Sequence, residues 1–114
     1  SLSHLPILDE KGCVSGVFSR ETLFDFTSMN EGICCDKNTK IAEFSEFLPF
    51  EEHLNESFLF VSRKARIDTL YPLLFKQREH QKRVSLLFVT ETGRKEEILL
   101  GIISVTDLLK YRQD

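Results

Sequence analysis

The stretch Gly101-Ile-Ile-Ser-Val-Thr-Asp-Leu-Leu109, near the end of the chain, decides the fold. It closes an apolar, β-prone run at residues 98–103 and leads into residues 105–111, whose apolar side chains recur at helical spacing. Ser104 stands between the two, where a serine side chain commonly caps the first turn of a helix. The stretch therefore predicts a strand that runs directly into a helix.

A hairpin precedes this junction. Residues 84–90 are apolar and β-prone, and the turn sequence Glu91-Thr92-Gly93 separates them from the strand at residues 98–103. The same order is found near the start of the chain. Residues 4–9 and 13–18 are predicted to be two strands, and a predicted helix starts at Ser19 and continues to residue 29. The chain therefore contains an internal repeat of a hairpin followed by a helix.

The two copies differ in the length of the hairpin loop. Residues 4–12 align with residues 85–93 at an offset of 81, and both segments end in glycine. Gly16-Val-Phe-Ser19 aligns with Gly101-Ile-Ile-Ser104 at an offset of 85. The four extra residues of the second copy fit the charged segment 94–97, which suits a solvent-exposed loop.

A short helix is predicted between the two copies. Residues 39–47 carry apolar side chains at helical spacing, with Thr39 as a candidate N-cap and Pro49 just beyond the end. We therefore expect residues 30–57 to form a linker with a short helix.

The front half of the repeat is predicted in the second copy only. Residues 58–62 predict a strand, and residues 67–81 predict a helix. Pro72 removes a backbone donor from the early turns of that helix, so we expect the helix to start near Asp68 or to bend at the proline. The second copy thus has the order strand, helix, strand, strand, helix, whereas the first copy begins at its hairpin.

Composition excludes several classes of protein. With 114 residues, 41% of them hydrophobic and 29% charged, the chain is one small globular domain or a tight pair of half-size units. The net charge of −3 gives no overall attraction to nucleic acid or to an anionic lipid surface. Residues 98–103 are too few to cross a membrane, and residues 1–8 lack the features of a signal peptide. We expect a soluble, cytoplasmic protein with neither a nucleic-acid nor a membrane partner.

The three cysteines indicate a reducing compartment. They cannot all pair internally, and Cys34 and Cys35 are adjacent, which is a poor geometry for a structural disulfide. Two adjacent thiols could also bind a soft metal or sense an oxidant. Metal sites draw on three or four ligands, however, and the neighbouring residues supply none. We expect ordinary half-buried cysteines and no metal site.

These segments resemble a known family, the cystathionine-β-synthase (CBS) domain pair or Bateman module. His4-Leu-Pro-Ile-Leu-Asp9 is similar to the Leu-Pro-Val-Val-Asp strand of the family, and residues 101–109 resemble its strand-to-helix nucleotide motif. The similarity covers about residues 1–29 and 58–112. It implies an α+β fold of β-α-β-β-α units, in which small three-stranded sheets have helices packed on one face. The expected division is residues 1–29 as the C-terminal half of a first repeat, 30–57 as the linker and 58–114 as the second repeat.

The resemblance also implies a nucleotide site at the second strand-to-helix junction. In the family an aspartate takes the ribose hydroxyls and hydroxyl side chains take the phosphate, and Ser104, Thr106 and Asp107 match that pattern. The chemistry is sound, because a helix N-terminus offers N–H groups to a phosphate and a carboxylate accepts two hydrogen bonds from a cis-diol. An ordinary helix cap gives the same Ser-x-x-Asp spacing, so this alternative stays open. The implied adenine slot has looser candidates, which are Val84, Ser85, Leu86, Ser62 and Ala65.

The first copy departs from this motif. Ser19-Arg20-Glu21-Thr22 has threonine where the motif has aspartate. Glu21 would repel a phosphate at close range, an effect that Arg20 would partly offset. We therefore expect at most one functional nucleotide site in this chain.

Catalysis is not expected. His4, His53 and His80 lack the spacing of a nucleophile and base or of metal ligands, and the sequence has no Gly-rich phosphate loop. The resemblance instead implies a regulatory module that binds AMP, ADP, ATP or S-adenosylmethionine and transmits occupancy to an effector domain or protein. The alternative is a ligand-free dimerisation or interaction module, because a missing strand and helix would expose apolar surface and a sheet edge. A homodimer is expected.

Overall fold

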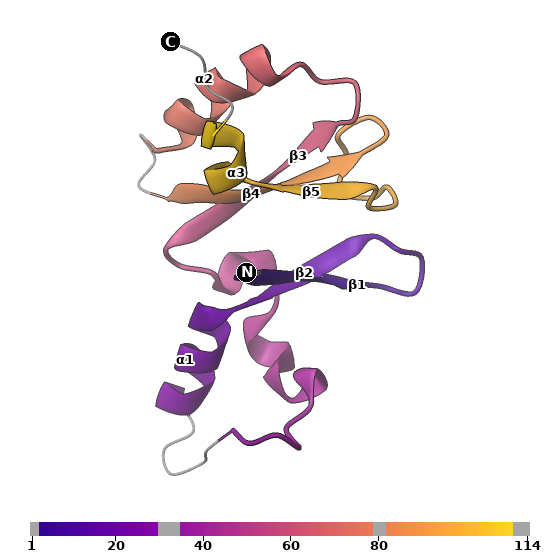
Figure 1. Ribbon diagram of the computed structural model, residues 1–114. Helices are drawn as coiled ribbons and strands as arrows, with labels where there is room; N and C mark the ends of the chain where they lie inside the picture. The colour runs from indigo at the N-terminus through magenta and orange to yellow at the C-terminus, as the bar shows by residue number, and fades with distance from the viewer. Residues whose placement is uncertain (1–2, 30–34, 79–81, 111–114) are drawn as a thin grey trace.

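The computed structural model describes residues 3–29, 35–78 and 82–110, which form two small sheets with helices on their outer sides (Figure 1). The first sheet is an antiparallel hairpin of β1 (His4–Leu8) and β2 (Val14–Ser19), and α1 (Arg20–Met29) follows directly. This is the predicted hairpin-to-helix unit. No helix among the described residues is long and apolar enough to cross a bilayer.

The second unit has the predicted order of strand, helix, strand, strand, helix. Its elements are β3 (Glu56–Ser62), α2 (Ile67–Arg78), β4 (Arg83–Thr90), β5 (Gly101–Ser104) and α3 (Val105–Lys110). The sheet order is β3-β4-β5, with β3 parallel and β5 antiparallel to β4. The whole chain is therefore of the α+β class.

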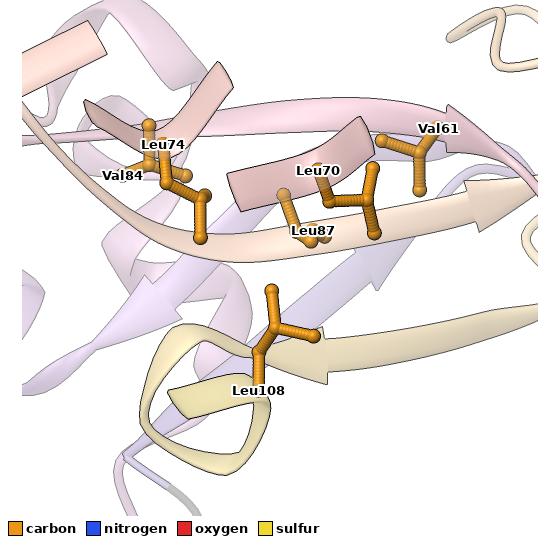
Figure 2. Close-up of a cluster of buried hydrophobic side chains, with 6 residues drawn as sticks. All are labelled: Val61, Leu70, Leu74, Val84, Leu87 and Leu108. Carbon is orange, nitrogen blue, oxygen red and sulfur yellow. The ribbon is translucent and has the colours of Figure 1, made fainter. Parts of the chain in front are cut away.

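The two helices of the second unit cover the outer face of its sheet. The apolar spacing of α2 aims Leu70 and Leu74 at the sheet, where they meet Leu87 of β4 and Leu108 of α3 (Figure 2). Burying each of these side chains contributes about 1.5–3 kcal/mol to folding. This outer core fixes the position at which β5 runs into α3.

A second core lies between the two sheets. Val14 and Val17 of β2 are buried against Leu86 and Phe88 of β4, and phenylalanines from β3 and from the linker pack around them. The ring centroid of Phe88 lies 5.9 Å from that of Phe58 and 5.3 Å from that of Phe60. This core joins the two copies of the repeat into one body.

The two hairpin loops confirm the internal alignment. Gly12 and Gly93, which the alignment places at equivalent positions, both have a φ of 86°, a left-handed value that favours glycine. A carboxylate closes each loop. Asp9 accepts hydrogen bonds from the backbone N–H groups of Lys11 (2.8 Å) and Cys13 (3.0 Å). Glu97, in the four-residue insertion, does the same in the second loop.

The hydrogen bonds to Glu97 keep its carboxylate ionised. It accepts from the backbone and the hydroxyl of Thr92, from the backbone of Arg94 and from the hydroxyl of Thr90, at 2.8–3.0 Å. These donors, the Thr92 backbone first, lower the pKa of Glu97 to about 2. The second loop is therefore organised around one negative charge.

Glu97→Gln is expected to lower the melting temperature at pH 7, because the amide loses the charge and one of the two acceptor oxygens. Since the pKa in the folded state is depressed, the stabilisation is present above the ordinary glutamate pKa of about 4.3 and is lost as the pH falls toward 2. Thermal unfolding followed by circular dichroism should show a smaller difference between variant and wild type at pH 3 than at pH 7. Glu96→Gln, on an exposed neighbour, is the control, and an equal deficit at both pH values would contradict the assignment.

Several boundaries differ from the sequence-based expectations. The connecting helix is a 3₁₀ helix, η1 (Ile41–Phe47), and Lys40 is its N-cap. The prediction of Thr39 as N-cap was wrong, because its hydroxyl instead accepts a hydrogen bond from the backbone of Asp36 (2.9 Å). Pro49 separates η1 from a second short 3₁₀ helix, η2 (Phe50–Glu52).

The strands and helices of the second unit also shift slightly. β3 begins at Glu56 rather than at residue 58, and β5 begins at Gly101 rather than at residue 98. The backbone N–H of Leu99 is directed away from its own sheet and donates to the carbonyl of Gly12 (2.9 Å) in the first hairpin loop. α2 starts beside Asp68, as expected, and continues through Pro72.

Candidate functional site

Ser104 ends β5, and its side chain caps α3. The Ser104 hydroxyl accepts a hydrogen bond from the backbone N–H of Asp107 (3.1 Å), so the helix-cap alternative is realised in the structure. Thr106 and Asp107 are exposed in the first turn, whereas Ser104 is half-buried. The cap uses only one lone pair of the serine oxygen, so its O–H group can still donate to another molecule. Capping and ligand binding are therefore compatible at this junction.

The start of β4 lies next to this junction. Leu86 is directly opposite Ser104 in the antiparallel register. On the other side of β4, Ser57 pairs with Val84 and Phe58 pairs with Leu86, so Ser85 is an extra residue that forms a bulge. The three adenine-slot candidates of β4 are thus brought to the same end of the sheet as Ser104.

The side chains of these candidates do not all face a ligand. Val84 is buried in the core under α2, and Leu86 is buried in the core between the sheets. The Ser85 hydroxyl oxygen is also buried and lacks a hydrogen bond of acceptable geometry. It nevertheless faces the Glu56 carboxylate closely enough to help lower the pKa of that group. At this end of β4, the feature that a ligand could contact is therefore chiefly the bulge at Ser85.

Ser62 and Ala65 lie at the opposite end of the sheet. Ser62 pairs with Thr90, four positions along β3 from Phe58, which is about 13 Å at the usual rise of a strand. Its hydroxyl donates to the carbonyl of Glu91 (2.9 Å) and accepts from the backbone of Lys64 (3.1 Å). The structure does not bring these two residues together with Ser104 and Asp107.

The first strand-to-helix junction is closed by its own residues. The Thr22 hydroxyl accepts a hydrogen bond from the backbone of Ser19 (2.9 Å), and the two hydroxyl oxygens are 3.4 Å apart. Thr22 is 1% exposed. Thr22, which stands where the motif has aspartate, is thus buried and bonded to Ser19 within the fold.

A cavity of about 270 Å³ nevertheless lies beside this first junction. It is lined by residues of both sheets, of α1 and of the segment before β1, which are Ser3, His4, Ser19, Arg20, Glu21, Glu56 and Arg83. A neighbouring cavity of about 290 Å³ shares Ser3, His4, Ser19 and Arg20. These volumes are at the lower end of those seen for small-molecule pockets. Neither cavity is lined by Ser104 or Asp107.

Sequence reasoning missed Glu56 and Arg83 as cavity residues. They start β3 and β4, and they approach Arg20 and His4 only because the two sheets pack face to face. The strands can be predicted from the sequence. No local sequence pattern indicates, however, which ends of the strands come together when the two sheets pack.

The wall of this cavity contains a hydrogen-bonded pair of side chains, His4 and Glu56. The His4 Nε2 nitrogen lies 2.9 and 3.1 Å from the two oxygens of Glu56. Burial alone would raise the pKa of Glu56, but hydrogen bonds from His4, then His53, outweigh it and hold the pKa far below its usual range. The Glu56 carboxylate is therefore ionised although it is 5% exposed.

The architecture matches several solved structures. A CBS domain from Clostridium difficile 630 has a TM-score of 0.58 and 15% identity, with 96% of this chain and 66% of that one covered. The CBS domain pair of protein MJ0100, in complex with 5′-methylthioadenosine and S-adenosyl-L-methionine, has a TM-score of 0.56 and 16% identity, with 96% of this chain and 68% of that chain covered. CBSX2 in complex with AMP has a TM-score of 0.56 and 19% identity, with 96% of this chain and 72% of that chain covered. The fold is that of a CBS domain pair.

This chain spans about two thirds of the length of the first two of those chains. No family model matches the sequence, and no curated protein is significantly similar to it. Within the part of the chain that the structure describes, no group of three or more His, Cys, Asp or Glu side chains could hold a metal ion. Cys13 and Cys35 are free thiols, Cys35 is half-buried as expected, and Cys34 lies outside the described residues.

Proposed function

We propose that this chain is a regulatory module that binds an adenine nucleotide or a related adenosyl compound at the β5–α3 junction. The observation that carries the proposal is the exposed Asp107 carboxylate in the first turn of α3, next to Ser104 and across from the β4 bulge. Two of the similar structures contain adenosyl ligands, which supports this class of ligand.

Each group at the junction has a distinct role in this proposal. Asp107 accepts hydrogen bonds from the ribose hydroxyls, while Thr106 and the Ser104 O–H group donate to the phosphate. The backbone around Ser85 provides polar contacts to the adenine edge. Ser62 and Ala65 lie at the other end of the sheet, so they contribute nothing to a ligand held at this junction.

Regulation requires that the ligand favours one arrangement of the module over another. We propose residues 1–29 and 58–114 as the two CBS units, joined by the linker 30–57, with occupancy passed to an effector domain or protein. Free thiols at Cys13 and Cys35 are in keeping with a cytoplasmic location.

Isothermal titration of the chain with AMP, ADP, ATP and S-adenosylmethionine tests the proposal. We expect at least one of them to bind with a stoichiometry of about one, because the first junction lacks the aspartate. Thermal shift measurements with the same compounds are an independent readout. Absence of heat and of any shift at millimolar concentration would contradict nucleotide sensing.

A homodimeric interaction module is the second candidate, and exposed apolar side chains of the first unit favour it. By strand register, Leu5 of β1 corresponds to Leu87 of β4, because their partners Phe18 and Ile103 are aligned; this is one position beyond the Leu86 of the sequence alignment. Leu23 of α1 corresponds to Leu108 of α3 by alignment. Leu87 and Leu108 are 0% and 3% exposed under α2, whereas Leu5 and Leu23 are 46% and 38% exposed. Together with the exposed Phe24, they form an open β1–α1 face that a second copy could cover.

Leu23→Glu is expected to shift the protein from dimer to monomer, since a charge at the centre of the β1–α1 face would be buried without a partner. Sedimentation velocity over a concentration series measures this shift. Ser45→Glu, on an exposed position of η1, adds the same charge outside the face and should leave the dimer intact. A wild-type protein that stays monomeric at high concentration would contradict this second function.

A further inference from the structure

A cluster of two histidines and a glutamate joins the two units of the fold; His53 and Glu56 are buried and His4 is half-buried. His4 comes from β1, Glu56 begins β3, and His53 lies in the linker just before β3. His53 is 2% exposed, and its Nδ1 nitrogen lies 3.6 Å from the Oε1 oxygen of Glu56, an ion-pair distance. The cluster thus connects the first hairpin, the linker and the second sheet.

Both ring nitrogens of His53 face groups that can only accept hydrogen bonds. Nδ1 faces the Glu56 carboxylate, and Nε2 lies 3.3 Å from the carbonyl oxygen of Leu48. A neutral imidazole has one N–H group, so one of its nitrogens would present a lone pair to an acceptor. The imidazolium form has two N–H groups, so it donates to the Leu48 carbonyl and places its positive charge at ion-pair distance from Glu56. The surroundings of His53 therefore select the protonated ring.

The surroundings of His4 make no such demand. Its Nε2 faces Glu56, but its Nδ1 lies 2.8 Å from the hydroxyl oxygen of Ser3, which can donate a hydrogen bond. A neutral His4 therefore satisfies both nitrogens. Between these two histidines, His53 is the one whose contacts depend on an extra proton.

The Leu48 carbonyl links His53 to the first sheet. It also accepts a hydrogen bond from the backbone N–H of Val17 in β2 (2.9 Å). The approach is close, since a β-carbon at Gly16 would lie 2.5 Å from the Leu48 oxygen. Residues 48–56 therefore form a strap that is held at Leu48 against β2 and at Glu56 within the second sheet.

We propose that protonation of His53 is a pH-sensitive latch, which holds the strap of residues 48–56 in place and so fixes the cavity wall at Glu56. Loss of the proton removes the His53 N–H group from either the Leu48 carbonyl or the Glu56 carboxylate, and with it the positive charge beside Glu56. The latch does not use Ser104, Thr106 or Asp107, so it can be tested without a nucleotide.

The charges around the cluster are compatible with this latch. His4 faces Glu56 from β1, Arg20 and Glu21 border the same cavity from α1, and Arg83 borders it from β4. Glu51 and Glu52 of η2 are exposed to solvent. Glu56 is thus the charged group that contacts His53 directly.

The direction of the titration follows from the same contacts. Burial alone would lower the pKa of His53, but Glu56 and the Leu48 carbonyl outweigh it and raise the pKa above its ordinary value. For a raised pKa, the stabilisation is present below about pH 6.5 and is lost as the pH rises through the folded-state value. The depressed pKa of Glu56 keeps the carboxylate ionised across this range.

Nuclear magnetic resonance of the imidazole nitrogens in the whole chain tests the latch directly. At pH 6.5 the nitrogen shifts of His53 should be those of the doubly protonated ring, and the midpoint of its titration should lie above that of free histidine. Above pH 6.5 the equilibrium constant of unfolding should rise by up to tenfold per pH unit, the slope for one proton. A neutral His53 ring at pH 6.5 would overturn the proposal.

Two variants separate the latch from a general effect of charge. Glu56→Gln keeps an acceptor oxygen but removes the negative charge, so the His53 midpoint should fall below that of free histidine. His4→Gln is the matched control and should leave the His53 midpoint above that of free histidine. If His4→Gln alone removed the pH dependence of unfolding, His4 would be the titrating group and the proposal would be wrong. Should Glu56→Gln fail to fold, the wild-type titration still decides.

Discussion

Asp107→Asn should weaken the binding of AMP or S-adenosylmethionine by at least tenfold without unfolding the protein. A carboxylate that accepts two hydrogen bonds from a ribose diol makes charge-assisted contacts, and hydrogen bonds to charged groups contribute about 1.5–3 kcal/mol each. Asparagine keeps one acceptor oxygen and loses the charge. Isothermal titration of wild type and variant with the same ligand measures the effect.

The exposed position of Asp107 makes this a binding test rather than a stability test. Removing an acid from the first turn of a helix costs about 0.3–1 kcal/mol through the helix dipole. Asp68→Asn is the matched control, because Asp68 is also an exposed acid in the first turn of a helix, α2, at the far end of the sheet. The two variants should unfold at similar temperatures, and only Asp107→Asn should lose affinity. Equal affinity in both variants would remove Asp107 from the site.

The internal repeat made much of the fold predictable. Gly12 and Gly93 were aligned from sequence, and both adopt the same left-handed φ. The hairpins and the strand-to-helix junctions were also predictable, because local patterns of apolar residues and turn residues determine them. The element boundaries were less so, since tertiary contacts such as the hydrogen bond from Leu99 to Gly12 decide where β5 begins.

The candidate site was only partly predictable. The Ser104 cap follows from a local motif, and the structure contains it. The bulge at Ser85 depends on the register between β3 and β4, which the sequence does not specify. Register likewise places Ser62 at the opposite end of the sheet. The cavity at Glu56 and Arg83 depends on how two sheets pack, so residues distant in sequence meet there without any shared motif.

Phe88→Ala should lower the free energy of unfolding by about 3–5 kcal/mol, the usual cost of truncating a fully buried phenylalanine. Phe88 lies on the central strand, β4, and is buried with Leu86 in the core between the sheets. Its ring centroid lies 5.3 Å from that of Phe60, 5.9 Å from that of Phe58 and 6.2 Å from that of Phe50. Urea denaturation followed by circular dichroism measures the change.

The control for this truncation is Phe24→Ala, which removes the same ring from an exposed position on α1 and should change the unfolding free energy by less than about 0.5 kcal/mol in the monomer. Comparing the two separates burial between the sheets from hydrophobicity as such. If both sheets unfold together, Phe88→Ala shifts the transitions of both units equally, because its cavity opens at their shared core. Two separate transitions would instead mean that the hairpin unit and the β3–β5 unit unfold independently, so that the aromatic packing between the sheets does not couple them.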